Sequence, residues 1–190
     1  MVSLDSLPTV FTTAQVKSLG VSERVLYQWR DNDQIEQVAR GIYIKPNIPV
    51  DLDLVEIAIR TSKATLCLTT ALARHDLSDD IPPTINVALP RQCRQPRTEA
   101  NVAWHRFGSE TFNVGREELE LVNDLRIGIY SPTRCVIDAF RLSHLYGKDQ
   151  ANQALKRWLQ KGGQASDLLT MTQSFPETKN QIIETLQILL

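Results

Sequence analysis

Residues 11–46 read FTTAQVKSLGVSERVLYQWRDNDQIEQVARGIYIKP, and they carry the signals of two short helices joined by a turn. Thr12 or Thr13 can cap a first helix, which would end at Gly20, a residue that readily adopts positive φ. Ser22 can then cap a second helix. Because only a turn separates the helices, the spacing predicts a helix-turn-helix.

A β-hairpin is predicted directly after the second helix. Residues 35–39 and 42–45 look like two strands, and Gly41 relaxes the turn that joins them. Two helices followed by such a hairpin have the element order of a winged helix-turn-helix. Double-stranded DNA is therefore the first partner to suspect.

The second helix has one apolar side. At about 100° per residue, Val25, Leu26 and Trp29 lie together, and the polar side chains opposite them would face a major groove. Recognition helices read base edges mainly from their N-terminal half, while a wing tip can touch a phosphate or enter a minor groove. The predicted DNA-binding residues are Ser22, Arg24, Tyr27, Gln28, Arg30, Arg40 and Lys45, with Arg24 and Gln28 as candidates for base contact.

Charge alone does not favour DNA over a protein partner. Residues 1–50 hold five basic and five acidic side chains, and small winged-helix units also serve as protein-interaction modules. A specific DNA binder needs only a local basic patch. On charge, both hypotheses stay open.

The composition is that of a globular protein with room for one small and one medium domain. Its 190 residues are 42% hydrophobic and 23% charged. The N-terminus lacks the basic start and apolar core of a signal peptide, and no stretch approaches the roughly 20 apolar residues that span a bilayer. We expect a cytoplasmic protein with no membrane partner.

A domain boundary is predicted where Pro46 and Pro49 interrupt the helix and strand periodicity. Residues 1–48 would be the winged helix-turn-helix DNA-binding domain, and residues 49–190 the C-terminal domain. The C-terminal domain is predicted to hold a mixed sheet over about 84–130 and helices over about 131–190. The fold class is therefore α+β, with a winged helix-turn-helix followed by a mixed α/β domain that ends in a helical bundle.

The sequence contains no recognisable catalytic or metal-binding motif. Cys67, Cys93 and Cys135 lie far apart, and none of the three histidines stands at metal-ligand spacing from another histidine or a cysteine. There is no GxSxG, HExxH or glycine-rich phosphate loop. We expect no enzyme activity, no cofactor and no metal.

Two later segments are basic. Residues 91–106 hold four arginines against one acidic residue, and residues 134–161 hold six basic against two acidic residues. The arginine-rich start of segment 91–106 is predicted to be a loop, which suits phosphate contact. A solvated loop with scattered ion pairs has the same composition. The possible phosphate-binding residues assigned from this charge are Arg91, Arg94, Arg97, Arg134 and Arg141.

Five stretches of the sequence share the pattern of one protein family. In order they are VFTTAQVKSLGVSERVLYQW, VARGIYIKP, LCLTTALARHDLSDDIP, NVALPR and GIYSPTRCVIDAFR. They resemble the AbiEi-type antitoxins of abortive-infection, type IV toxin-antitoxin systems. The resemblance implies an N-terminal winged helix that binds inverted repeats in its own promoter and a C-terminal domain with antitoxin activity. It also implies a functional partner, a nucleotidyltransferase-like toxin, that is often neutralised without a stable complex.

Carried over by position, the resemblance makes Ser22 to Arg30 the recognition helix and Arg40 the wing tip. The basic residues of the C-terminal domain named above would then be the candidates for the antitoxin surface. Family members usually have a longer first helix than the residues before Pro8 provide here. We therefore expect residues 1–50 alone to fold poorly, with the helix that follows Leu52 helping to complete their core.

The sequence thus predicts a transcriptional autorepressor and antitoxin, monomeric in solution. Two alternatives stay open. One is a solitary winged-helix regulator with a sensory C-terminal domain. The other is a nucleic-acid-processing enzyme that the winged helix brings to DNA.

Overall fold

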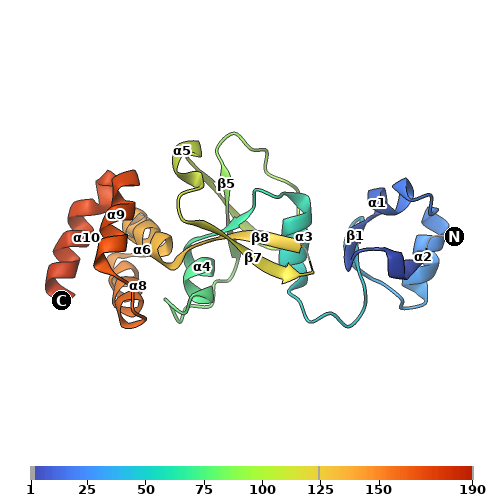
Figure 1. Ribbon diagram of the computed structural model, residues 1–190, viewed down its shortest axis with the longest axis horizontal. Coiled ribbons are helices and arrows are strands. Elements are labelled where there is room, and N and C mark those ends of the chain that lie inside the picture. The colour runs from blue at the N-terminus through green and yellow to red at the C-terminus, as the bar shows by residue number, and fades with distance from the viewer. Residues whose placement is uncertain (1–2, 124, 190) are drawn as a thin grey trace. The chain divides into compact units, whose positions relative to one another are not determined.

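The computed structural model describes residues 3–123 and 125–189, which form two compact units (Figure 1). Unit 1 comprises the chain up to Ala64 together with Pro96–Asn101 and Leu119–Ile127. Unit 2 comprises Thr65–Gln95, Val102–Glu118 and the chain from Gly128 onward. The first division therefore falls at Ala64 and not near residue 48, and two later segments return to unit 1.

Unit 1 has its first helices where the sequence predicts them. The 3₁₀-helix η1 (Leu4–Ser6) precedes helices α1 (Thr13–Ser18) and α2 (Glu23–Asp31). Thr12 begins α1 with a capping box: its hydroxyl accepts the Gln15 N–H, and the Gln15 side chain accepts the Thr12 N–H. Gly20, with φ +80°, makes the turn to α2.

A three-stranded antiparallel sheet completes the N-terminal part of unit 1. Its strands β1 (Val10–Thr12), β2 (Glu36–Ala39) and β3 (Ile42–Ile44) lie in the order β1-β3-β2. Gly41, with φ +77°, forms the tip between β2 and β3 as predicted. The strand β1 was not predicted, because its three residues acquire a partner only when β3 folds alongside them.

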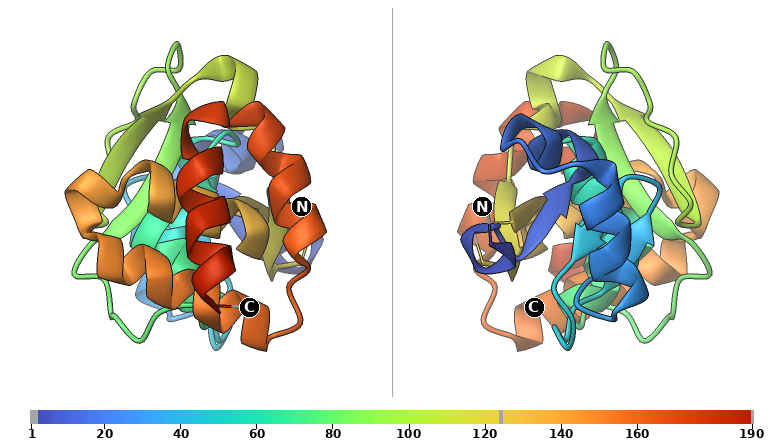
Figure 2. Two further views of the ribbon diagram at one scale, coloured as in Figure 1. Left: turned by 90° about the vertical axis from the view of Figure 1, so that its left-hand side faces the viewer. Right: turned by 90° about the vertical axis from the view of Figure 1, so that its right-hand side faces the viewer.

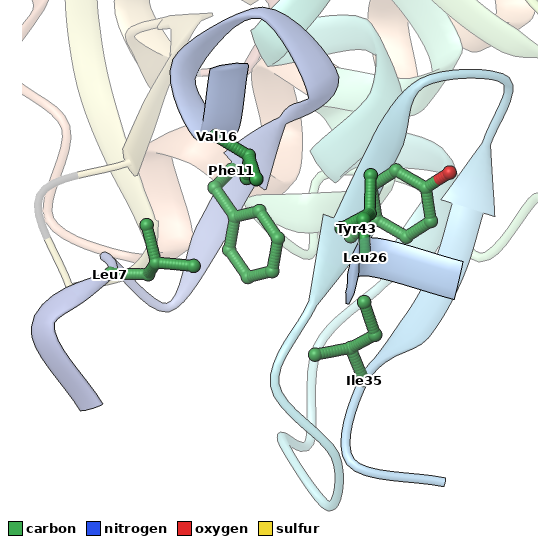
Figure 3. Packing of buried hydrophobic residues seen from close by; sticks show 6 residues of the cluster. All are labelled: Leu7, Phe11, Val16, Leu26, Ile35 and Tyr43. Carbon is green, nitrogen blue, oxygen red and sulfur yellow. The ribbon is translucent and has the colours of Figure 1, made fainter. Parts of the chain in front are cut away.

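One hydrophobic cluster fills the space between the two helices and this sheet. Figure 3 shows its six buried side chains pointing toward one another; they come from strands β1 and β3, from both helices, and from the residues just after η1 and just before β2. The rings of Phe11 and Tyr43 are stacked with centroids 6.1 Å apart. The cluster comprises Leu7, Phe11, Val16, Leu26, Ile35 and Tyr43, with Leu4, Val21 and Trp29 partly buried against it.

A second cluster explains why the first unit extends to Ala64. Helix α3 (Leu52–Arg60) places the fully buried Val55 against Val10, Ala39, Ile42 and Ile44 of the sheet. The predicted Leu52 helix therefore does help to complete the N-terminal core, but over the strands and not over the cluster around Leu26. Val122 and Leu125 of the returning segment also pack against this second cluster.

Unit 2 contains a mixed five-stranded sheet, in the order β6-β5-β4-β8-β7. Strand β4 pairs antiparallel with β5 and parallel with β8, and β5 pairs parallel with β6. The hairpin of β7 and β8 continues beyond unit 2, and its distal part is the returning segment of unit 1. The strands are β4 (Thr65–Leu66), β5 (Ile85–Pro90), β6 (Val102–Phe107), β7 (Arg116–Val122) and β8 (Leu125–Tyr130).

Helix α6 lies at the centre of the helices of unit 2. It packs against α4, α8, α9 and α10, which gather beside it in Figures 1 and 2. Ser131 caps α6 by accepting the Arg134 N–H, and Pro132 is its first residue. The helices are α4 (Leu68–Arg74), α5 (Ser109–Phe112), α6 (Pro132–Arg141), α7 (Ser143–Tyr146), α8 (Lys148–Gln160), α9 (Ala165–Met171) and α10 (Pro176–Leu189), with the 3₁₀-helix η2 (Thr172–Ser174) before α10.

Among residues 3–123 and 125–189, no helix combines the length and apolarity needed to cross a bilayer.

Candidate nucleic-acid interface

Helix α2 presents a polar surface, as its periodicity predicts. Leu26 is fully buried, whereas Val25 and Trp29 are half-buried on the same side of the helix. The exposed residues at the start and along the outer side of the helix are Ser22, Glu23, Arg24, Tyr27 and Gln28. Ser22 occupies the N-cap position without a capping hydrogen bond from its side chain. The Ser22 hydroxyl therefore accepts no hydrogen bond from the first backbone amides of α2.

A salt bridge connects the end of α1 to the start of α2. The Lys17 Nζ and Glu23 Oε1 atoms are 2.6 Å apart. The hydrogen bond to Glu23 raises the pKa of Lys17 above its ordinary value. This pair sets a cation beside the one acidic side chain in the first turn of α2.

Arg30 is held on the surface of α2 by two neighbours. Its Nε and Nη2 atoms donate to the Asp31 Oδ1 atom at 3.1 and 2.9 Å. Its guanidinium also lies over the Tyr27 ring, 5.1 Å from the centroid. The hydrogen bonds that Arg30 donates to the Asp31 carboxylate raise the pKa of Arg30. Arg30 and Tyr27 therefore form a stacked, oriented pair.

A pocket of about 420 Å³ lies between α2 and the β2–β3 hairpin. It brings together three of the residues predicted to bind DNA, Tyr27, Arg30 and Arg40. The other lining residues are Thr13, Glu23, Gln37, Gly41 and Tyr43. A helix face and a hairpin tip separated in sequence thus form one continuous surface within unit 1.

Lys45 lies apart from this pocket. Its Nζ atom donates to the Leu7 carbonyl at 2.7 Å, and its backbone N–H donates to the Thr9 carbonyl at 3.0 Å. The side chain is half-buried. Lys45 thus anchors the segment that leads into β1, a role that the sequence did not predict.

The backbone of Arg40, at the hairpin tip, is held by two charged side chains of unit 1. Its N–H donates to the Glu99 Oε1 atom at 2.9 Å, and its carbonyl accepts a hydrogen bond from Arg60 Nη2 at 3.1 Å. The Arg40 side chain is exposed. The tip is therefore fixed while its guanidinium faces solvent.

Glu56 is the buried centre of these contacts, and sequence reasoning missed it. It is 2% exposed, and its Oε2 atom accepts the Glu99 and Ala100 N–H groups at 2.9 and 3.0 Å. Its Oε1 atom lies 3.3 Å from Arg60 Nε. The available signal was a carboxylate between Val55 and Ile57, one helical turn before an arginine.

The structure does not group the possible phosphate-binding residues of the later segments as charge suggested. Arg91, Arg94 and Arg97 are all exposed, but Arg97 belongs to unit 1 while the other two belong to unit 2. Arg91 lines a pocket of about 510 Å³ with residues at the start of α5.

The placement of Arg134 on a surface is wrong. Its side chain is fully buried, with the guanidinium 4.3 Å from the centroid of Tyr130 and 4.4 Å from that of Phe175. Its Nη1 atom donates to the carbonyls of Thr111 and Val114 at 2.8 and 2.6 Å. Arg134 therefore ties α6 to the chain around α5.

Arg141 is also drawn inward, because both arginines face one buried carboxylate. Asp138 Oδ2 lies 3.0 Å from Arg134 Nε, and its Oδ1 lies 3.2 Å from Arg141 Nη2. The Asp138 side chain is 1% exposed and that of Arg141 is 19% exposed. Burial raises the pKa of Asp138 above its ordinary value, although the two arginines oppose this shift. The spacing Arg-x₃-Asp-x₂-Arg in one helix was the sequence signal for this triad.

Within the two ranges that the structure describes, no three His, Cys, Asp or Glu side chains form a group that could hold a metal ion. Two of the cysteines, Cys67 and Cys135, are buried, and burial raises the pKa of both thiols.

One family model matches the N-terminal part of the chain. No curated protein matches the chain. Residues 4–44 match the family model described as "Transcriptional regulator, AbiEi antitoxin". The matched range runs from η1 to the end of β3, and it contains α2 and the hairpin tip. This match confirms, over residues 4–44, the resemblance to AbiEi antitoxin transcriptional regulators that the sequence predicts.

Proposed function

We propose that this protein is a DNA-binding transcriptional autorepressor and the antitoxin of a type IV toxin-antitoxin system. It would act in the cytoplasm, in abortive infection, against a nucleotidyltransferase-like toxin. The observation that carries the proposal is the shared pocket of α2 and the hairpin tip, because it lies on elements matched to the AbiEi family model. The pocket offers Tyr27, Arg30 and Arg40 on one surface, which suits a phosphate backbone.

In this proposal, α1 and α2 are the helix-turn-helix and the β2–β3 hairpin is the wing. Helix α2 enters the major groove, where Arg24 and Gln28 contact base edges from its exposed side. Ser22 and Tyr27 lie at the edge of this contact. Operators with inverted repeats would be occupied by two copies of a protein that is monomeric in solution.

The phosphate contacts come mainly from Arg30 and Arg40. Arginine suits this role because its planar guanidinium binds phosphate oxygens in a bidentate manner. Lys45 contributes indirectly, since its ammonium already donates to the Leu7 carbonyl and supports the segment before β1.

The test is a titration of the full chain against a labelled fragment of its own upstream region, with random DNA as competitor. We expect preferential binding to the upstream fragment. Arg24→Ala should lose about 1–3 kcal/mol of binding free energy on that fragment and relax specificity, whereas Arg40→Gln should weaken both DNAs alike. Lys179→Ala, an exposed change on α10, is the matched control and should leave both affinities unchanged. Equal affinity for upstream and random DNA would contradict the regulator role.

The antitoxin role is tested separately, by co-expression with the product of an adjacent nucleotidyltransferase-like reading frame. Growth should be restored by the full chain even if no complex survives purification. DNA binding without rescue would instead indicate a solitary regulator.

A further inference from the structure

The segment Pro96–Asn101 belongs to unit 1, although the chain on either side of it belongs to unit 2. Two backbone amides fix it there, because Glu99 and Ala100 both donate to Glu56. Glu56 is 2% exposed, so these hydrogen bonds are shielded from water and hold the segment firmly.

The same segment holds the hairpin tip. The Glu99 carboxylate accepts the Arg40 N–H at 2.9 Å, while Arg60, which also contacts Glu56, donates to the Arg40 carbonyl. Both polar groups of the Arg40 backbone are therefore set by one network centred on Glu56. A shift of the segment would move the tip with it.

Arg97 stands two residues before Glu99 and is exposed. Two residues of extended chain span at most about 7 Å, so the Arg97 backbone lies close to the residue that grips the tip. One DNA strand carries a phosphate for every 3.4 Å or so of helix axis. Because the Glu99 side chain reaches from this segment to the Arg40 N–H, the long side chains of Arg97 and Arg40 begin near enough to reach phosphates of the same strand.

We propose that the Pro96–Asn101 segment is an additional arm of the DNA-binding surface, in which Arg97 contacts a backbone phosphate beside the one bound by Arg40. Glu56 and Glu99 are positioning residues, which act through the place they give to the tip. This inference rests on the DNA-binding function proposed above. It assigns Arg97 to DNA and separates it from Arg91 and Arg94.

The salt dependence of DNA binding tests the contact, because each neutralised phosphate changes the slope of log K against log salt concentration by about 0.9. Arg97→Gln should reduce the slope by about one unit and weaken upstream and random DNA alike. Arg94→Gln is the control: this arginine is also exposed and lies three residues away, but it belongs to unit 2. Arg94→Gln should leave the slope unchanged. A slope for Arg97→Gln equal to that of the unsubstituted protein would overturn the proposal.

Two substitutions of Glu99 test whether its side chain positions Arg40 at the hairpin tip. The Glu99→Gln side chain keeps an oxygen that can accept the Arg40 N–H, whereas Glu99→Ala has none. We expect Glu99→Gln to bind DNA at least as tightly as the unsubstituted protein, since a negative charge near phosphate is removed. Glu99→Ala should bind roughly two- to tenfold more weakly, the range that one hydrogen bond supplies. If Glu99 acted through charge alone, both variants would bind more tightly, and the positioning role would be wrong.

The two proposals fail in different ways. A full chain that binds no DNA sequence preferentially would remove the regulator function and this arm with it. If Arg24→Ala and Arg40→Gln behave as DNA contacts while Arg97→Gln behaves like Arg94→Gln, only the arm is refuted. Thermal melts of each variant, monitored in parallel, should match that of the unsubstituted protein, because Arg97 and Glu99 are exposed.

Discussion

Arg134 is buried between aromatic rings, although it stands in a segment whose charge predicts an exposed side chain. Its contact with Asp138 is mainly Coulombic, because the atoms are close while the angles do not meet hydrogen-bond geometry. Removing one member of such a pair leaves the other charged in a place without water. The triad with Arg141 therefore makes α6 sensitive to substitution at this position.

We predict that Arg134→Met lowers the free energy of unfolding by about 3–5 kcal/mol. The double variant Arg134→Met/Asp138→Leu should lose less than the sum of the two single changes, since it removes both fully buried charges together and leaves only Arg141, whose side chain is 19% exposed. Chemical denaturation of the full chain measures both quantities. Arg91→Met, at an exposed position, is the control and should have little effect. A loss below about 1 kcal/mol for Arg134→Met would contradict the account of a buried charge pair.

His105 predicts a dependence of stability on pH. Its Nε2 atom lies 2.8 Å from the Asn86 Oδ1 atom, and burial lowers its pKa below the ordinary value of 6.5. The folded state therefore binds a proton less readily than the unfolded chain does. The contribution of neutral His105 to the free energy of unfolding is complete above about pH 6.5, and it is lost as the pH falls through the lowered pKa.

The midpoint temperature of unfolding should therefore decrease when the pH is lowered from 7.5 to 5.5. The substitution His105→Gln should make this decrease smaller. His144→Gln, at an exposed position on α7, serves as the matched control. An unchanged pH dependence in His105→Gln would show that the effect has another origin.

At the scale of elements, local sequence signals predict where a helix or turn lies, but they do not predict which distant segments pack against it. Thr12, Gly20 and the Ser131–Pro132 pair each act within a few residues, so α1, the turn after it and α6 lie where the sequence places them. β4 has only two residues and was missed, because its pairing with β5 and β8 depends on distant chain. Arg24, Tyr27 and Gln28 of α2 are exposed for the same local reason. The contact by which Glu99 fixes Arg40, in contrast, spans 59 positions and has no local signal.

Helix α3 supports a prediction about fragments. A fragment of residues 1–50 lacks Val55, so the sheet face formed by Val10, Ile42 and Ile44 would lie open to water. We expect this fragment to show no cooperative thermal transition by circular dichroism. A fragment of residues 1–64 should gain a weak one, because α3 then covers that face. Equal, cooperative melts for both fragments would contradict this role of α3.

At the scale of the whole molecule, each unit is built from chain segments that lie far apart in sequence. The prolines near residue 48 mark a loop, but the predicted boundary there missed α3 and the two returning segments. No local pattern could reveal these, since Pro96–Asn101 and Leu119–Ile127 join unit 1 through Glu56, Val122 and Leu125.

Because segments of the two units alternate along the chain, we can predict the result of a single backbone cleavage. A protease site inserted between Arg94 and Gln95 would divide the chain so that each fragment carries parts of both units. It would also separate β5 from its parallel partner β6. We expect the cleaved halves to co-elute in size exclusion under native conditions and to separate only in denaturant. Separation in native buffer would show that the units do not hold the halves together.

The three-segment composition of unit 1 also sets when it can fold during synthesis. The ribosome releases Ala64 well before Ile127, and at about 5–20 residues per second the interval is about 3–13 seconds. A nascent chain would therefore carry an incomplete unit 1 until most of the protein has been made. Chains terminated before Leu119 would lack the last segment of unit 1, so we expect their unit 1 to stay incompletely packed however long they persist.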